Sequence, residues 1–154
     1  MEEIETLRLR VAELENELAD LRMKMTATHF EWTGPDGMRH REDGPAVIYA
    51  DGTRSWWKRG KMHRDGGPAI EWPNGDWDWY REGFLHREDG PAKTNQDGSF
   101  WYLHGNLHRE DGPACEFKSG ECRYYWRGKE IKVRSREAFL RRVKVLQIEE
   151  VHAG

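Results

Sequence analysis

The chain has 154 residues, of which 36% are apolar and 34% charged, and its formal net charge at pH 7 is −3. The length suits one ordinary domain, the low apolar content argues against a large globular core, and the acidic balance argues against nucleic acid as a partner. The sequence has no apolar run of 18 residues, and its acidic start lacks the apolar stretch of a signal peptide. We therefore expect a cytoplasmic protein of a bacterium or a phage-infected cell, with membrane contact disfavoured. Two cysteines fit a reducing compartment.

Residues 1–28 carry a heptad pattern. Apolar side chains recur at alternating spacings of three and four residues, with no Gly or Pro among them, which predicts a coiled-coil helix whose apolar stripe needs a partner. The residues expected to mediate this self-association are Ile4, Leu7, Val11, Leu14, Leu18, Leu21 and Met25. The alternative is a helix that folds back on its own chain.

The charges beside this seam indicate how two copies would align. In a parallel pair Glu3 meets Arg8 and Glu17 meets Arg22, whereas an antiparallel pair places Glu15 opposite Glu15. The parallel arrangement is favoured, mainly through specificity, because each exposed ion pair contributes little energy. β-branched residues at heptad position a and Leu at position d favour a dimer, and a trimer is the alternative.

The string H-R-E-D-G-P-A organises the middle of the chain. It occupies residues 40–46, 86–92 and 108–114, and as H-R-D-G-G-P-A residues 63–69, so that successive copies begin 23, 23 and 22 residues apart. A regular interval of this size is typical of repeat proteins. We call these four strings the link segments.

Between the link segments the chain follows one plan. A short strand leads to a turn dipeptide, an aromatic second strand follows, and then another Gly. The turn dipeptides are Asp51-Gly52, Asn74-Gly75, Asp97-Gly98 and Ser119-Gly120. Asp-Gly and Asn-Gly between apolar strands predict a β-hairpin with a two-residue turn. Such a turn would pair Ile70 with Trp79 and Trp72 with Trp77 on the buried face.

This register predicts two columns of side chains. The residues four after each turn Gly, which we expect to form a buried ladder of rings, are Trp56, Trp79, Tyr102 and Tyr124. The residues five after it, on the opposite face, are Trp57, Tyr80, Leu103 and Tyr125. The same register places Cys115 and Cys122 diagonally on one face, where no disulfide is expected.

The repeat resembles the MORN family, and more closely the MORN-like variant repeats of bacterial and phage proteins, whose link reads H-R-x-D-G-P-A. The resemblance covers residues 40–131 and includes Gly-Pro-Ala, the turn Gly and the aromatic pair. The chain departs from the better-known eukaryotic repeat, which opens Tyr-x-Gly, because it reads Ile48-Tyr49-Ala50 there. The resemblance implies a single-layered antiparallel sheet used as a scaffold or binding surface, with no common chemistry.

Residues 132–154 are expected to form a short capping helix and a tail. Ser135 is a suitable N-cap, and the apolar stripe that follows would cover the open edge of the last hairpin. The stripe consists of Phe139, Leu140, Val143 and Leu146. The chain is expected to fray from Glu149 onward.

The expected fold is thus mostly β. It is a single-layered antiparallel stack of about four MORN-like hairpin repeats at residues 29–131, with an N-terminal coiled-coil helix at residues 1–28 and a C-terminal capping segment at residues 132–154.

Each link segment places a His beside acidic residues, a combination that can serve metal binding or acid–base catalysis. The copies lie one repeat apart, whereas a metal site needs three or four ligands around one point and a catalytic site needs one special copy. We therefore predict no catalytic residue, metal ligand or cofactor, and no enzyme. The expected role is structural: His and Arg pack on rings and bind backbone carbonyls, Asp closes the turn, and Gly-Pro sets its direction.

The second column is the candidate binding surface, because partly exposed Trp, Tyr and Arg dominate interface energetics. The candidate partner-binding residues are Trp57, Arg54, Arg59, Tyr80, Arg81 and Tyr125. The alternative is that the link segments or a second chain cover this face.

The favoured function is a non-enzymatic oligomeric binding protein that inhibits or scaffolds an unidentified protein partner, in the manner of a phage or bacterial inhibitor or antitoxin. The alternatives are a protein that sequesters a nucleotide-type small molecule and a structural or membrane-associated scaffold.

Overall fold

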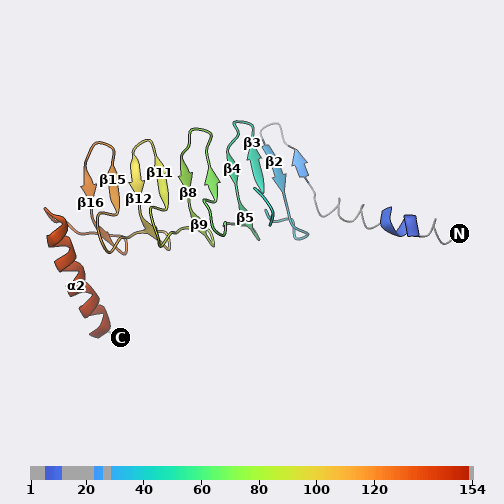
Figure 1. Cartoon of the computed structure of the whole chain (residues 1–154). Helices are drawn as coiled ribbons and strands as arrows, with labels where there is room; N and C mark the ends of the chain where they lie inside the picture. The colour runs from blue at the N-terminus through green and yellow to red at the C-terminus, as the bar shows by residue number, and fades with distance from the viewer. Residues whose placement is uncertain (1–5, 12–22, 26–28, 153–154) are drawn as a thin grey trace.

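The computed structural model describes residues 6–11, 23–25 and 29–152. These residues form a ten-stranded antiparallel sheet, four small two-stranded hairpins and a C-terminal helix, with residues 6–11 also helical (Figure 1). The predicted mostly β fold of antiparallel hairpins with a C-terminal helix is confirmed.

The large sheet follows the order of the chain, and every neighbouring pair of strands is antiparallel. Figure 1 shows its strands standing in one row. In sheet order they are β1 Met23–Met25, β2 His29–Trp32, β3 Val47–Tyr49, β4 Arg54–Ser55, β7 Ile70–Glu71, β8 Trp77–Asp78, β11 Lys93–Asn95, β12 Gly98–Phe100, β15 Cys115–Phe117 and β16 Cys122–Arg123.

A small hairpin follows every second strand from β4 onward. The four are β5 Trp57–Lys58 with β6 Lys61–Met62, β9 Tyr80–Arg81 with β10 Phe84–Leu85, β13 Tyr102–Leu103 with β14 Asn106–Leu107, and β17 Tyr125–Trp126 with β18 Lys129–Glu130. Both residues of each connecting turn have positive φ, as at Glu82 (53°) and Gly83 (86°), which is the type I′ geometry. Each repeat is therefore a large hairpin, a small hairpin and a link segment, where the sequence had predicted one hairpin.

The predicted two-residue turns are one residue too short in three repeats. The N–H of Gly75 donates to the Trp72 carbonyl, so that residues 73–75 form a three-residue loop ending in a Gly with φ of 88°. Equivalent bonds connect Gly52 with Tyr49 and Gly120 with Phe117. A left-handed last residue is the usual ending of three-residue hairpin loops.

This longer loop shifts the register by one residue. Ile70 pairs with Asp78 and Glu71 with Trp77, so the predicted pairs of Ile70 with Trp79 and of Trp72 with Trp77 are wrong. Because strand side chains alternate between faces, a one-residue shift exchanges the faces of the second strand.

The third repeat keeps a two-residue turn, but at residues 96–97, because Asn95 pairs with Gly98. Its ladder residue is consequently Trp101, whose N–H donates to the Ala114 carbonyl as Trp79 donates to Ala92. Tyr102 belongs to the other column, where Leu103 had been predicted. The complete ladder is Trp32, Trp56, Trp79, Trp101 and Tyr124, alternating across the sheet with Ala46, Ala69, Ala92 and Ala114.

The sheet has two different faces. The link face carries the Trp–Ala ladder, and all four of its alanines are fully buried. The opposite side, which we call the open face, carries Tyr49, Trp57, Trp72, Tyr80, Phe100, Tyr102, Phe117 and Tyr125. Cys115 pairs with Arg123 and Cys122 with Glu116, so the cysteines lie on opposite faces rather than on one; both are free.

Helix α2 (Arg136–His152) takes the place of a fifth link segment. Ser135 caps it, accepting from the Ala138 N–H, as predicted. Phe139 and Val143 are buried against Tyr124 and Trp126. The helix therefore covers the small-hairpin end of the last repeat, and from there it projects away from the sheet (Figure 1), leaving β16 exposed.

The predicted fraying of the C-terminal segment is wrong up to His152. The helix continues to that residue, and Glu150 accepts a hydrogen bond from the Trp126 indole at 3.2 Å and pairs with Arg127 at 3.0 Å.

The predicted N-terminal helix is wrong at Met23–Met25, because these residues form β1 and pair with β2, with Met25 opposite Phe30. The sheet thus begins before residue 29 and contains five large hairpins rather than about four within the described residues. Leu7 and Val11 lie in the helical residues 6–11 and are exposed. The other seam residues, Ile4, Leu14, Leu18 and Leu21, lie outside the described residues.

Gly98→Ala tests the close approach of β12 to β15. A Cβ at Gly98 would overlap the Glu116 carbonyl oxygen and lie 2.9 Å from the Phe117 Cα, so we expect a loss of about 3 kcal/mol in the free energy of unfolding. Gly120→Ala is the control, because a Cβ there meets nothing and only its φ of 88° is strained, at a cost of about 1 kcal/mol. Urea denaturation measures both, and equal losses would contradict the register around Gly98.

Candidate functional site

The Arg of every link segment lies over the ladder Trp of the preceding strand. The distances from the guanidinium carbon to the ring centroid are 4.3 Å for Arg41 on Trp32, 3.8 Å for Arg64 on Trp56, 4.2 Å for Arg87 on Trp79 and 4.1 Å for Arg109 on Trp101. These are cation–π contacts, which gain strength where the cation is partly desolvated.

Each of these arginines is also tied back to its own link segment. Arg87 donates from a terminal nitrogen to the Pro91 carbonyl at 3.4 Å and from Nε to Asp89 at 2.8 Å. The bond from Arg87 holds the pKa of Asp89 below its usual value. A Cβ at Gly90 would lie 3.1 Å from the Arg87 guanidinium carbon, which explains the Gly of the motif.

The second link segment differs in one contact. Gly66 replaces the Asp that holds Arg in the other copies. Arg64 keeps a contact with Glu71 on β7 at 2.6 Å, which Arg109 makes with Glu116 in addition to its contact with Asp111. The contact between Arg64 and the Pro68 carbonyl, at 3.0 Å, is kept. The contacts that all four link segments share are therefore those of the Arg guanidinium with the ladder ring and with the Pro carbonyl.

The His of each link segment fixes the following small hairpin. Its Nδ1 accepts a hydrogen bond from the N–H of the first residue in the type I′ turn, at 3.1 to 3.2 Å. The pairs are His40 with Arg59, His63 with Glu82, His86 with His104 and His108 with Arg127. An accepting Nδ1 requires a neutral ring with its proton on Nε2.

The structural interpretation of the motif is confirmed for Arg, which packs on a ring and binds a backbone carbonyl. It is also confirmed for the ring packing of His, as where His108 lies 4.7 Å from the Trp126 ring. Two of its details are corrected: His accepts from a backbone N–H rather than binding a carbonyl, and Asp holds the Arg rather than closing a turn. In the described part of the chain, no three His, Cys, Asp or Glu side chains gather where they could hold a metal ion.

On the open face, small buried side chains lie in the middle of the sheet and large rings lie on either side of them. Its small middle residues, Val47, Ser55 and Cys115, are almost completely buried although no described element forms a second layer over them. The large rings on either side cover them; for example, the Trp57 indole donates to the Ser55 hydroxyl at 2.8 Å. Burial raises the pKa of Tyr80 and Tyr102, and that of Cys115 to about 11.

One ion pair lies in the middle of this aromatic surface. Lys93 contacts both carboxylate oxygens of Asp78 at 3.1 and 3.2 Å, and its ammonium lies 5.7 Å from the Trp72 ring centroid. Asp78 is buried, and the pKa of its carboxyl is raised because desolvation outweighs the attraction of Lys93. The pair explains how Lys93 is accommodated at a position that aligns with Val47, Ile70 and Cys115 in the other repeats.

The structure brings together only part of the predicted partner-binding set. Trp57, Tyr80 and Tyr125 lie on the open face, together with Tyr102, which was missed because the turn of the third repeat was expected one residue too late in the chain. The arginines that we expected beside these rings do not lie on the open face. Arg54 lies on the link face and pairs with Glu71, Arg81 also points to that side by strand alternation, and Arg59 sits in the turn after β5. The cation that does lie over the Trp57 ring is Arg39, at 4.9 Å.

Comparisons of the chain with known protein families, with curated proteins and with solved structures found no match. Among the described residues, no helix combines the length and apolar character needed to cross a lipid bilayer.

The neutral state of His108 makes stability depend on pH. Burial lowers the pKa of His108, outweighing the nearby carboxylates, so the unfolded chain binds its proton more readily. The stabilisation is complete above the unfolded pKa of about 6.5 and declines as the pH falls below it. We expect lower unfolding midpoints in urea at pH 5.5 than at pH 7.5. His108→Asn, which offers a non-titrating acceptor at the Nδ1 position, should reduce this difference, and an unchanged difference would contradict the assignment.

Proposed function

We propose that this chain is a non-enzymatic, oligomeric binding protein whose open face binds a partner protein. The observation that carries the proposal is the open face itself, where eight aromatic side chains share one side of the sheet and no described element packs over them. Large rings that are partly exposed and held in place contribute most of the energy of protein interfaces.

The dimensions of the sheet suit such an interface. Ten strands spaced about 4.8 Å apart extend over about 43 Å, and six residues of strand over about 20 Å, which gives roughly 860 Å². A standard protein interface buries about 800 Å² on each partner. The rings are held by hydrogen bonds and by neighbouring rings, such as Phe100 against Phe117 at 5.5 Å, so little conformational entropy is lost on binding.

The role of the link segments favours binding over catalysis. Each of their histidines already uses Nδ1 to hold a turn, and each of their arginines is occupied by a ring and a carbonyl. What varies between repeats is the open face, as expected of a surface that has adapted to one partner.

We further propose that the repeats are MORN-like variants and that the heptad residues before β1 join two or three copies. Coupling several open faces would raise the overall affinity without new contacts. A bacterial or phage inhibitor, antitoxin or scaffold fits this organisation.

Paired substitutions on the two sides of two small hairpins, β9–β10 and β13–β14, test the proposal. Tyr80→Ala and Tyr102→Ala alter the open face, whereas Arg81→Ala and Leu103→Ala alter the adjacent residues that point to the link side. A partner would be identified by pull-down from bacterial lysate with mass spectrometry, and its affinity then measured for each variant. We expect each Tyr variant to weaken binding about thirtyfold, as loss of a hot spot of about 2 kcal/mol does, and the controls to bind normally. Equal affinity of all four variants would exclude the open face.

A further inference from the structure

The last ladder residue lacks a hydrogen bond that the first four ladder residues make. The N–H of each ladder Trp donates to the carbonyl of a link Ala at 2.6 to 2.8 Å. Tyr124 is the fifth ladder residue, and its N–H makes no hydrogen bond with a described residue, because α2 replaces the fifth link segment. The Tyr124 carbonyl is used as in the other repeats, since it accepts from the Ile131 N–H at 2.8 Å. One backbone donor is therefore left open at this end of the sheet.

Cys122 leaves two further backbone groups open on the same edge. The Phe117 N–H donates to the Glu121 carbonyl at 2.9 Å, so the next pair along β15 and β16, Glu116 with Cys122, exchanges no hydrogen bonds. The N–H and C=O of Cys122 therefore point away from β15. Inside the sheet, the equivalent residue of β4, Arg54, turns the same groups to β7. The edge of β16 thus presents donors and an acceptor in the order of an antiparallel ladder.

A cavity lies beside this edge. It has a volume of about 390 Å³, and residues 121–124 line one side of it and residues 130–134 the other. Tyr124, Ile131 and Val133 make part of this lining apolar. Figure 1 shows β16 as the outermost strand of the row. The open edge therefore borders a hollow rather than a packed element.

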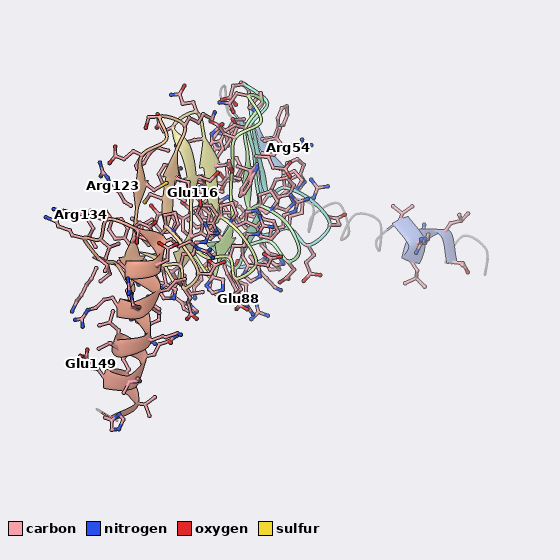
Figure 2. All side chains as sticks on the ribbon, turned by 60° about the vertical axis from the view of Figure 1, so that its left-hand side comes forward. Arg54, Glu88, Glu116, Arg123, Arg134 and Glu149 are labelled. Carbon is pink, nitrogen blue, oxygen red and sulfur yellow. The ribbon has the colours of Figure 1, made fainter. Side chains whose placement is uncertain are left out.

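The side chains around this cavity carry an excess of positive charge. Arg123 is paired with Glu121 at 2.7 Å, whereas Lys132 and Arg134 are exposed and form no ion pair with a described residue. Glu130 is the one acid of the lining without such a pair. Figure 2 shows Arg123 and Arg134 on the same side of the molecule.

The positions of these cations explain the excess. Ile131 takes the place of the link His, so Lys132 stands where the link segments have Arg, and Arg134 where three of the four have Asp. The carboxylate that holds the Arg in those segments is therefore missing here, and an acid from outside the chain would complete the arrangement.

We infer that the open edge of β16 binds an extended, acidic strand of a partner protein, which adds to the sheet as a further antiparallel strand. The strand takes the place that a link Ala and the residues after it occupy in the inner repeats. Its small residue accepts from the Tyr124 N–H, and the second residue after that exchanges both hydrogen bonds with Cys122. An acid before the small residue meets Lys132 and Arg134. The inference does not rest on the proposed function, because it uses the edge of the sheet and not the open face.

The inner repeats show which occupant this edge geometry accepts. At four places the same side of a second strand pairs with an extended segment that begins at Gly-Pro-Ala, and the Ala carbonyl accepts from the ladder N–H. Main-chain hydrogen bonds of this kind provide affinity, and the side chains of the added strand provide specificity. A strand with a small residue preceded by an acid repeats this arrangement.

A second copy of the chain fits the edge less well. Its β1 is the strand at the other end of the sheet. In β1, Met23 lies opposite the ladder residue Trp32, at the register position that link Ala residues take in the inner repeats. The β1 sequence, Met-Lys-Met, also has a cation and no acid. It would therefore bring a larger residue to Tyr124 and no charge that complements Lys132 and Arg134.

The test is an NMR titration of the full chain, observed at the backbone amides of Cys122 and Tyr124. The probe is acetyl-Glu-Asp-Gly-Pro-Ala-Val-Ile-Tyr-amide, which has the sequence of residues 42–49, and it should shift both signals. The same peptide with Pro in place of Ile cannot donate to the Cys122 carbonyl and should bind about tenfold more weakly. A peptide with Gln and Asn in place of Glu and Asp should bind about fivefold more weakly, because it loses the attraction of Lys132 and Arg134.

Two substitutions at one position separate the edge from the rest of the fold. Cys122→Pro removes an outward N–H, which an edge strand tolerates because that N–H faces away from the sheet. It should weaken peptide binding about fivefold, as loss of one hydrogen bond does. Cys122→Ser keeps the N–H and should bind normally, as should Tyr80→Ala on the open face. Equal urea midpoints of the two Cys122 variants would show that the fold is kept, and the Pro-containing peptide tests the same edge in the unsubstituted chain.

Three kinds of result would overturn the inference. Unmoved amide signals, or equal binding of the Pro-containing peptide, would show that no strand adds to this edge. Equal binding of the peptide with Gln and Asn would exclude an acidic partner strand. Light scattering that shows long assemblies of the parent chain, lost in Cys122→Pro, would assign the edge to β1 of a second copy.

Discussion

The contact on which the structure depends is the guanidinium of each link Arg, held between a ladder Trp and the carbonyl of its own link Pro. A single-layered sheet lacks a second layer to cover its rings, so the link segments supply this cover. The Ala that ends each segment lies fully buried between the ladder rings of neighbouring hairpins. The spacing of the repeats thus follows from the alternation of a large ring and a small methyl group. At the last repeat Phe139 of α2 replaces the Arg, with its ring 4.8 Å from that of Tyr124.

This arrangement divides the sheet into two surfaces with different freedom to vary. On the link face the contacts of the Arg guanidinium with a ladder ring and a Pro carbonyl recur in each repeat, whereas the groove between two segments is lined by Leu103 in one place and by Lys58 in another. On the open face each repeat contributes different side chains, and the buried Asp78–Lys93 pair interrupts the rings near the middle. A protein partner on the open face would use a surface that the link segments leave free.

Much of the fold could be predicted from the sequence, because the link segments mark the repeat and the strands carry aromatic residues. The errors in the predicted register arose because a turn was one residue longer, or lay one residue earlier, than the sequence suggested. Asn-Gly is compatible with a two-residue and a three-residue loop, and the choice between them decides which face Trp77 occupies. Counting from Gly98 placed Leu103 in the second column, although Gly98 lies within β12 and the column residue is Tyr102. The small hairpins were missed because two-residue strands are too short to show a period. The heptad pattern extended to Met25, which instead pairs in the sheet because its neighbour β2 offers an unpaired edge.

A double-mutant cycle on Arg87 and Trp79 tests the central claim most directly. The free energies of unfolding of Arg87→Met, Trp79→Leu and the double variant would be measured against the parent chain by urea denaturation. If the guanidinium and the ring stabilise the link segment together, the loss of unfolding free energy in the double variant should be smaller than the sum of the two single losses by about 1 kcal/mol or more. A double-variant loss equal to the sum of the single losses to within about 0.3 kcal/mol would show that the two side chains act independently. Some other contact would then have to hold the link segments against the sheet.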